Sequence, residues 1–421
     1  MSTNAIEVEL GDDHADIRSH DTFVTGVPYA TFDRLRREDP VSWWEEDDGS
    51  GFWAVTRYDD VLTVSREAAR FSCTNGIRLE EMAADELQAR TTMMELDPPN
   101  HTAYRRLVSR PFARREVFAY EEAIRAIARN VVDEVHGTPT LDFTNLVARQ
   151  LPMRMLGRLL GLPIEDGDWL VQRGDALIGN TDPEFTDFVV DQVDTDAYRL
   201  LPFRSPVSLE LFEYAASALD ARRTNPTPDV LTALLQPMAD GERLADADLK
   251  NFFTLMVAAG NDTTRYTMTA GMRALVERPA TRELLAREPE RIELAIEEIL
   301  RWSSVTMHFR RTAAVDTELR GRTIRAGDKV VMWFVSANYD DAQFAEPYRF
   351  DVGRTPNDHV TFGRHSPHLC LGAQLARLEL KVLFEELLPR IADVQLVGPV
   401  DRLRSNFISG MKHLPLEVSW R

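Results

Sequence analysis

Cys370 is one of two cysteines in this 421-residue chain, and it lies in the loop Phe362 to Gly372. The segment after the loop, Ala373 to Leu388, has the apolar spacing of a buried helix. A thiolate at a helix N-terminus is stabilised by free backbone N–H groups and by the helix dipole, which lower the pKa of the thiol. The loop therefore has the character of a metal-ligand site.

Two kinds of metal site fit this loop. His359, His365, His368 and Cys370 lie within a dozen residues and could bind zinc, but their spacing is not a usual pattern of a closed zinc site. Ligation of a haem iron needs Cys370 alone and leaves the other axial position open for oxygen. The second cysteine, Cys73, is expected to be a small buried residue and not a ligand.

A second candidate site lies in the middle of the longest predicted helix, 246–277. Its sequence Ala-Ala-Gly-Asn-Asp-Thr-Thr, 258–264, puts Gly and several poor helix formers into a helix interior, where Gly alone costs about 1 kcal/mol relative to Ala. Such violations are expected at functional positions. Asp262 beside Thr263 could relay protons to a molecule bound in the groove that Ala259 and Gly260 open. The alternative is a turn between two helices, which the apolar residues on both sides disfavour.

A third candidate is the pair Glu298 and Arg301, which are three residues apart on a predicted helix from Glu288 to Trp302. Taken alone, it is a surface ion pair that contributes roughly 0.2–0.5 kcal/mol.

These groups require a mostly helical scaffold with small sheets. We expect residues 1–20 to form a flexible tail and find no clear domain boundary after it. A further helix begins near Asn100 and carries His101 and Arg105 one turn apart, and the polar stretch 180–206 is a connector or lid. Strands are predicted by alternating or apolar runs in three places: 41–55, which forms a hairpin, 310–335 and 394–420.

Composition excludes several classes of protein. A hydrophobic content of 44% indicates a packed globular chain, and a net charge of −19 argues against binding nucleic acid or an anionic membrane. No apolar run reaches the roughly 18 residues of a membrane span, and the N-terminal segment does not resemble a signal peptide, so we expect a cytoplasmic protein without a membrane anchor. A local arginine cluster suggests an acidic docking partner, although a solvated face explains it equally well: Arg105, Arg106, Arg110, Arg114 and Arg115.

Taken in this order, the motifs resemble the cytochrome P450 family of haem-thiolate monooxygenases, from about Asp97 to the C-terminus. The match consists of five separate segments. They are a segment similar to one that binds haem propionates (Asp97-Pro-Pro-Asn-His101-Thr, with Arg105), an oxygen-activation motif (Ala259 to Thr264), a helix pair (Glu298 and Arg301), a propionate-binding arginine (Arg311) and a haem-ligand loop (Phe362, His368, Cys370 and Gly372).

The resemblance implies a mainly α fold with minor β sheets, with residues 21–421 forming one domain. It also implies haem b (iron protoporphyrin IX) as the cofactor, with Cys370 as the axial ligand of the iron. Ala259 and Gly260 would contact the haem, and Asp262 and Thr263 would guide protons to O2. The helix pair would be buried and completed by Arg349. A ferredoxin-type electron donor with its reductase would supply two electrons.

The ligand loop departs from the usual family pattern. Phe362 stands eight residues before Cys370 instead of seven, and Ser366 occupies the second glycine position. Loops with an extra residue are similar to those of the branch that oxidises steroid side chains and methyl-branched lipids. The segment from Arg404 to Lys412 is also similar to the steroid, terpenoid and branched-lipid branch.

The resemblance also indicates which residues face a hydrophobic small-molecule substrate, with core packing as the alternative for each: Leu255, Ala258, Val305, Thr306, Met307, Phe407 and Ile408. These residues favour a bulky terpenoid, steroid-like or branched-lipid substrate that is hydroxylated at an aliphatic carbon. Desaturation, ether or ring formation and multistep oxidation stay open, and so does a non-catalytic haem or zinc binding protein. Arg78 could meet a substrate carboxylate or lie on the surface.

Overall fold

The computed structural model describes residues 10–421, in which helices dominate, as predicted. The helices are α1 Tyr29–Glu38, α2 Tyr58–Arg66, α3 Ala84–Arg90, α4 Asn100–Val108, α5 Arg114–Phe118, α6 Glu121–Val135, α7 Gln150–Leu160, α8 Gly167–Ile178, α9 Val207–Thr224, α10 Val230–Leu234, α11 Asp246–Val276, α12 Pro279–Arg287, α13 Ile292–Ser303, α14 Phe334–Ala337 and α15 Ala373–Leu387. The strands are β1 Val41–Glu45, β2 Gly51–Val55, β3 Phe71–Ser72, β4 Thr140–Asp142, β5 His308–Ala313, β6 Thr317–Leu319, β7 Arg322–Ile324, β8 Lys329–Trp333, β9 Ile391–Leu396, β10 Asp401–Arg402, β11 Met411–His413 and β12 Pro415–Trp420.

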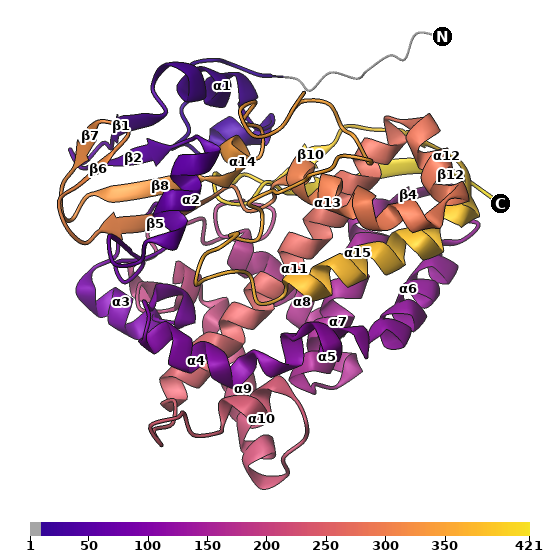
Figure 1. The fold of residues 1–421 in the computed structure, drawn as a ribbon. Helices are drawn as coiled ribbons and strands as arrows, with labels where there is room; N and C mark the ends of the chain where they lie inside the picture. Colours follow the sequence, from indigo (N-terminus) through magenta and orange to yellow (C-terminus); the bar gives the residue numbers. More distant parts are fainter. Residues whose placement is uncertain (1–9) are drawn as a thin grey trace.

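The strands form small sheets at the periphery of the helical body. The largest has the order β1-β2-β8-β5-β3, so the hairpin formed by β1 and β2 is joined to β8 and β5. Within this sheet only the β2–β8 pairing is parallel. Figure 1 shows this sheet at the left, with indigo and orange strands side by side. The sheet β4-β12-β9 lies on the opposite side, near the C-terminus.

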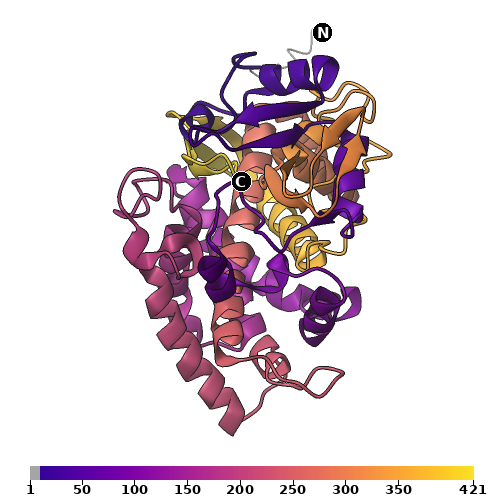
Figure 2. The same cartoon turned by 90° about the vertical axis from the view of Figure 1, so that its left-hand side faces the viewer.

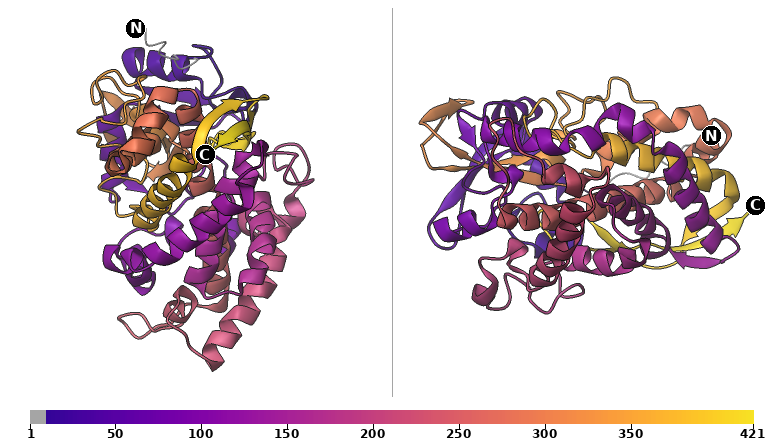
Figure 3. Two further views of the ribbon diagram at one scale, coloured as in Figure 1. Left: turned by 90° about the vertical axis from the view of Figure 1, so that its right-hand side faces the viewer. Right: turned by 90° about the horizontal axis from the view of Figure 1, so that it is seen from below.

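Helix α11 is the central element. It runs without interruption from Asp246 to Val276, so the alternative of two helices separated by a turn is wrong. Its N-terminal half contributes Phe252 and Phe253 to a core shared with α7 to α10, and its C-terminal half contributes Met268 and Met272 to a core shared with α6, α13 and α15. Figures 2 and 3 show the helices of both groups around it, with α9 extending away from the sheet.

One expectation about the N-terminal region is wrong. From residue 10 onward the chain is packed: Ile17 is fully buried, and the backbone N–H of Ala15 donates to Oγ1 of Thr31 at 2.9 Å. The expected flexible tail therefore does not extend to residue 20, and its first nine residues lie outside the described part. Helix α3 lies in the stretch before Asp97, and its Glu86 accepts from the backbone N–H of Ala83.

Glu298 is fully buried on α13 and forms a bidentate ion pair with Arg301, with both N–O distances at 2.8 Å. The same carboxylate accepts from the backbone N–H of Asp351, from Nδ2 of Asn357 and from Nε of Arg354. Arg301 also donates to the carbonyls of Asn338 and Pro347, at 2.9 Å each. A buried charge is tolerated only when it is paired and hydrogen-bonded in this way. The network therefore fixes the meandering segment 338–357 against α13.

The prediction that Arg349 is the third member of this network is wrong. Its side chain is 62% exposed and pairs with Glu346, whereas Arg354 is 3.1 Å from Glu298 and 9% exposed. The physical reason is geometric: the turn after Arg349 places the backbone N–H of Asp351 against Glu298 and directs the later arginine inward.

This difference predicts unequal effects of two matched substitutions. Arg354→Ala should lower the free energy of unfolding by about 2–4 kcal/mol, because it removes one partner of a buried charge. Arg349→Ala should change it by less than about 0.5 kcal/mol, because an exposed ion pair contributes little. Urea unfolding of both variants measures the two values, and equal losses would contradict the assigned network.

Candidate active site

A cavity of about 570 Å³ lies between α11 and the loop that precedes α15. One wall comes from α11, with Ala258, Ala259, Gly260 and Thr263, and the facing wall includes Cys370. Further parts of the lining come from other segments of the chain, among them 77–95, 202–204, 305–309 and 407–408. Segments far apart in the sequence therefore converge on one cavity.

Cys370 directs its thiol into this cavity. Cys370 is exposed, and the space to which it is exposed is this cavity within the protein. Burial raises the pKa of Cys370, while the backbone N–H groups of Gly372 and Ala373 and the charges of Arg105 and Arg377 act in the opposite direction. The expectation of a lowered thiol pKa is therefore wrong for the protein alone, because desolvation outweighs the helix N-terminus. A bound metal ion would reverse this balance, since coordination deprotonates a thiol.

The ligand loop accommodates its extra residue at His365. Gly363 and His365 have positive φ values, 72° and 63°, whereas the φ of Ser366 is not positive. The serine therefore does not occupy a left-handed position that would favour glycine. Oγ of Ser366 instead accepts from the backbone N–H of His368 at 3.1 Å. The backbone N–H of Cys370 donates to the carbonyl of Phe362 at 2.8 Å and closes the loop.

Four basic side chains gather beside the loop: His101, Arg105, Arg311 and His368. The rings of His101 and His368 are 4.1 Å apart between centroids, and both ring nitrogens of His101 are buried without a hydrogen-bond partner. Arg311 is 5% exposed and donates to the carbonyl of Arg310, and no carboxylate in residues 10–421 forms an ion pair with it. Arg105 donates to the carbonyl of Leu369 at 2.5 Å.

This basic cluster fits the carboxylates of a haem. Burial, followed by the charge of Arg311, lowers the pKa of His368 to about 2, and burial likewise lowers the pKa values of His101 and Arg311. Buried donors and cations of this kind need anionic acceptors. Two carboxylates bound here, with Cys370 at an iron, would satisfy the unpaired groups.

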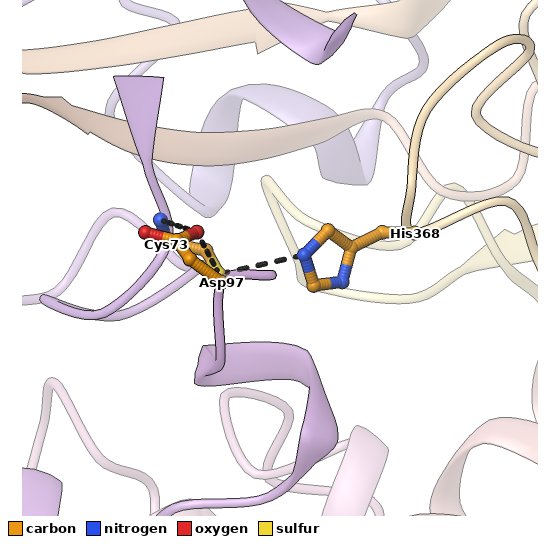
Figure 4. Close-up of side chains that lie close together, drawn as sticks. All are labelled: Cys73, Asp97 and His368. Atoms are coloured by element: carbon orange, nitrogen blue, oxygen red, sulfur yellow. Dashed lines mark hydrogen bonds between the residues drawn. The ribbon is translucent and has the colours of Figure 1, made fainter. Parts of the chain in front are cut away.

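The residues of the zinc alternative do not converge. Nε2 of His359 is 3.1 Å from Glu297, and the exposed side chain of His365 pairs with Arg364. A different group of metal-compatible side chains does occur within residues 10–421: Cys73, Asp97 and His368 (Figure 4).

That group behaves as a hydrogen-bonded cluster. The thiol of Cys73 donates to Oδ1 of Asp97 at 3.1 Å and lies 3.5 Å from Nε2 of His368. Burial raises the pKa of Cys73, so the thiol stays protonated, and the three donors are one fewer than a closed zinc site requires. Cys73 is buried, as expected, and it fixes Asp97 at the start of the segment that carries His101.

Asp262 and Thr263 do not face the same space. Thr263 lines the cavity and donates to the carbonyl of Ala259 at 3.0 Å. Asp262 points away from the cavity, where its carboxylate lies 2.9 Å from Arg265, which also binds Asp175 at 2.7 Å. Burial raises the pKa of Asp262 to about 7, although Arg265 opposes that shift. The predicted acid–alcohol pair is therefore separated by the helix, because consecutive residues project in different directions.

Most of the predicted substrate residues line the cavity: Leu255, Ala258, Val305, Thr306, Phe407 and Ile408. Met307 is the exception, since it is fully buried in the core against the largest sheet. Alternation along an extended segment explains this, because neighbouring side chains point to opposite sides. Backbone hydrogen bonds from Met307 to Phe407 and from Ser409 to Val305 hold the two wall segments together.

Glu379 was not predicted from the sequence. It lies on the cavity-facing side of α15, in line with Ala376, is 2% exposed and has no partner for Oε1. Burial raises its pKa to about 8. An acidic residue at a helical spacing that is otherwise apolar was the available signal.

A raised carboxyl pKa makes stability depend on pH. The folded state disfavours the ionised form of Glu379, so ionisation of this residue destabilises the protein. The destabilisation is absent below the ordinary pKa, grows as pH rises above about 4.5 and reaches its full size above about pH 8. Glu379→Gln should therefore raise the free energy of unfolding relative to wild type, by on the order of 3 kcal/mol more at pH 8 than at pH 5. Urea unfolding at both pH values, with exposed Glu293→Gln as a control that shows no such trend, measures the effect. A pH-independent difference for Glu379→Gln would contradict it.

Comparisons with known proteins agree with this geometry. The Cytochrome P450 family model matches residues 180–405. The chain is 36% identical to a methyl-branched lipid omega-hydroxylase of Mycobacterium tuberculosis, covering 98% of this chain and 95% of that enzyme. It is 34% identical to a steroid C26-monooxygenase of the same organism, covering 94% and 90%.

A solved structure shares the fold. A Mycobacterium marinum cytochrome P450 in complex with pseudoionone superposes with a TM-score of 0.83 at 39% identity, over 92% of this chain and 94% of that one. No helix among residues 10–421 is long and apolar enough to cross a membrane. The family match, the near full-length relatives and the shared fold show together that this chain belongs to the cytochrome P450 family of monooxygenases.

Proposed function

We propose that this monooxygenase hydroxylates an unactivated aliphatic carbon of a bulky hydrophobic substrate, such as a terpenoid, a steroid-like molecule or a branched lipid. The observation that carries the proposal is the cavity itself, in which the Cys370 thiol faces apolar residues of α11 and the segments 305–309 and 407–408. Relatives named for branched-lipid and steroid oxidation support the same class of substrate. Residues 21–421 act as one catalytic unit in this proposal, because every wall comes from a different part of the chain.

The cofactor in this proposal is haem b, with Cys370 as the axial ligand of its iron. His101, Arg105, Arg311 and His368 bind its two carboxylates, an assignment supported by the two unpaired ring nitrogens of His101 and by the buried positive charge of Arg311, which forms no ion pair with another described residue. When bound, the haem supplies the iron at which O2 is activated. The N–H groups of Gly372 and Ala373 and the charge of Arg105 stabilise the Cys370 thiolate.

The remaining chemistry assigned to this chain is proton delivery and exclusion of water. Thr263 is the hydroxyl on the α11 wall, next to Ala259 and Gly260, and passes protons into the cavity. Asp262, with a pKa near 7, is matched to proton transfer at neutral pH, but it must exchange its contact with Arg265 for one with Thr263 or a water molecule. Apolar residues such as Leu255 and Phe407 desolvate the substrate.

Cytochrome P450 monooxygenases require a redox partner, and we propose a ferredoxin with its reductase. Four arginines are exposed around α4 and α5, on the side where Arg105 contacts the Cys370 loop: Arg106, Arg110, Arg114 and Arg115. None of the four forms an ion pair with another described residue. An unpaired basic patch on a chain of net charge −19 favours an acidic partner, which it would steer electrostatically.

Turnover with a reconstituted ferredoxin and reductase tests the function. A panel of branched-chain lipids, steroids and terpenoids should include at least one compound that gains a single oxygen atom at an aliphatic carbon. Thr263→Ala should consume the same reductant with about tenfold less product, because protons then reach the cavity without control. Product analysis against reductant consumption measures this coupling. Unchanged coupling would remove Thr263 from the mechanism, and the absence of any oxygenated product would overturn the proposed reaction.

A further inference from the structure

One part of the cavity wall is charged, although most of the wall is apolar. It comes from the segment 77–95 and from the loop at Phe203, and it carries Arg78, Glu80, Glu81, Arg90 and Arg204. A charged wall has no role in binding a pure hydrocarbon, since each charged group must be kept solvated or paired. The three arginines of this wall differ in their hydrogen bonds.

Of the arginines on this wall, Arg78 is the one that donates no hydrogen bond to a carboxylate of residues 10–421. Its guanidinium carbon lies 4.7 Å from the ring centroid of Phe407 and 5.5 Å from that of Phe203. Nε is buried and has no hydrogen-bond partner. The nearest carboxylate oxygen, Oε2 of Glu80, is 3.8 Å from Nε, which is too far for a hydrogen bond.

The other two arginines are already paired. Arg90 and Arg204 both donate to Oε1 of Glu86, at 3.0 and 2.7 Å. Arg78 is also not on the surface, because its side chain is only 19% exposed and that side chain lines the cavity. Two aromatic rings hold its guanidinium in place, so an available donor is directed at the space that a substrate would fill.

The charge around Arg78 indicates which kind of acceptor fits. Burial alone would raise the pKa of Glu80. The positive charge of Arg78, followed by that of His20, outweighs this effect and lowers the pKa to about 2, so Glu80 is ionised at neutral pH. Arg78 is thus compensated in charge but not in hydrogen bonding. A substrate carboxylate would meet repulsion from Glu80, whereas a neutral oxygen accepts a hydrogen bond without adding charge.

We propose that Arg78 binds substrate by donating a hydrogen bond to a neutral oxygen, a ketone, ester or hydroxyl group, carried by the hydrophobic molecule. The substrate class is then an oxygenated hydrophobe and not a free fatty acid. This inference rests on the proposed function, because it names the substrate class of the same cavity.

Three probes of one shape test the inference on the haem-loaded enzyme: geranylacetone, the hydrocarbon in which a methylene replaces its carbonyl, and geranylacetic acid. Calorimetric titration measures binding of each, independently of any spectral change. Arg78→Met should lower the ratio of ketone to hydrocarbon affinity by about tenfold or more, because it removes a charge-assisted hydrogen bond and keeps the packing between the rings. Glu80→Gln should improve binding of the acid by about tenfold, because it removes the repelling charge.

Two controls accompany these variants. Arg204→Met removes an arginine of the same wall that is already paired with Glu86, and it should change ketone and hydrocarbon affinity by the same factor. Arg78→Lys keeps a donor and should retain part of the ketone preference, which separates lost hydrogen bonding from misfolding.

Several results would overturn the inference: an unchanged affinity ratio in Arg78→Met, a wild-type preference for the acid, or no measurable binding of the ketone. Failure of the proposed function is distinguishable from these, because it would appear as the absence of oxygenated products from every compound of the wider panel. An enzyme that hydroxylates a compound of that panel while Arg78→Met leaves the ratio unchanged would refute only the role of Arg78.

Discussion

The fully buried carboxylate of Glu298 is the constraint on which the rest of the site depends. A charge without solvent must have its acceptor sites filled, and here Arg301, Arg354, Asn357 and the backbone of Asp351 fill them. Arg301 continues the network to Asn338, whose side chain accepts from the backbone N–H of Val360. The chain from α13 to the start of the Cys370 loop is therefore held by one set of hydrogen bonds, and the position of the thiol follows from it.

The electrostatics of the cavity follow from desolvation. Burial raises the pKa of Cys370 and Glu379, and it lowers the pKa of His101, His368 and Arg311. Desolvation disfavours the charged form of each of these groups. A metal at the thiol and carboxylates at the basic cluster would supply the missing charges, so the cavity is complementary to an anionic metal cofactor as well as to a hydrophobic substrate.

Sequence reasoning succeeded where a local pattern determines the structure. The apolar spacing of 246–277 and 373–388 predicted α11 and α15, and the separated motifs predicted which segments meet around one cavity. It failed where side-chain direction depends on tertiary packing. Nothing in the spacing of Arg349 and Arg354 shows which one turns inward, and adjacency of Asp262 and Thr263 in the sequence hides their opposite orientations on the helix. Glu379 and Arg78 acquire their importance only from the cavity that surrounds them.

The central claim is that Cys370 holds a haem iron, and the absorption spectrum of the reduced protein with carbon monoxide tests it most directly. Thiolate ligation predicts a red-shifted Soret band in the wild type that is retained in Cys73→Ala and lost in Cys370→Ala, because the thiol of Cys73 is held by its hydrogen bond to Asp97. A Soret band that persists unchanged in Cys370→Ala, or a colourless wild-type protein containing stoichiometric zinc, would contradict the account.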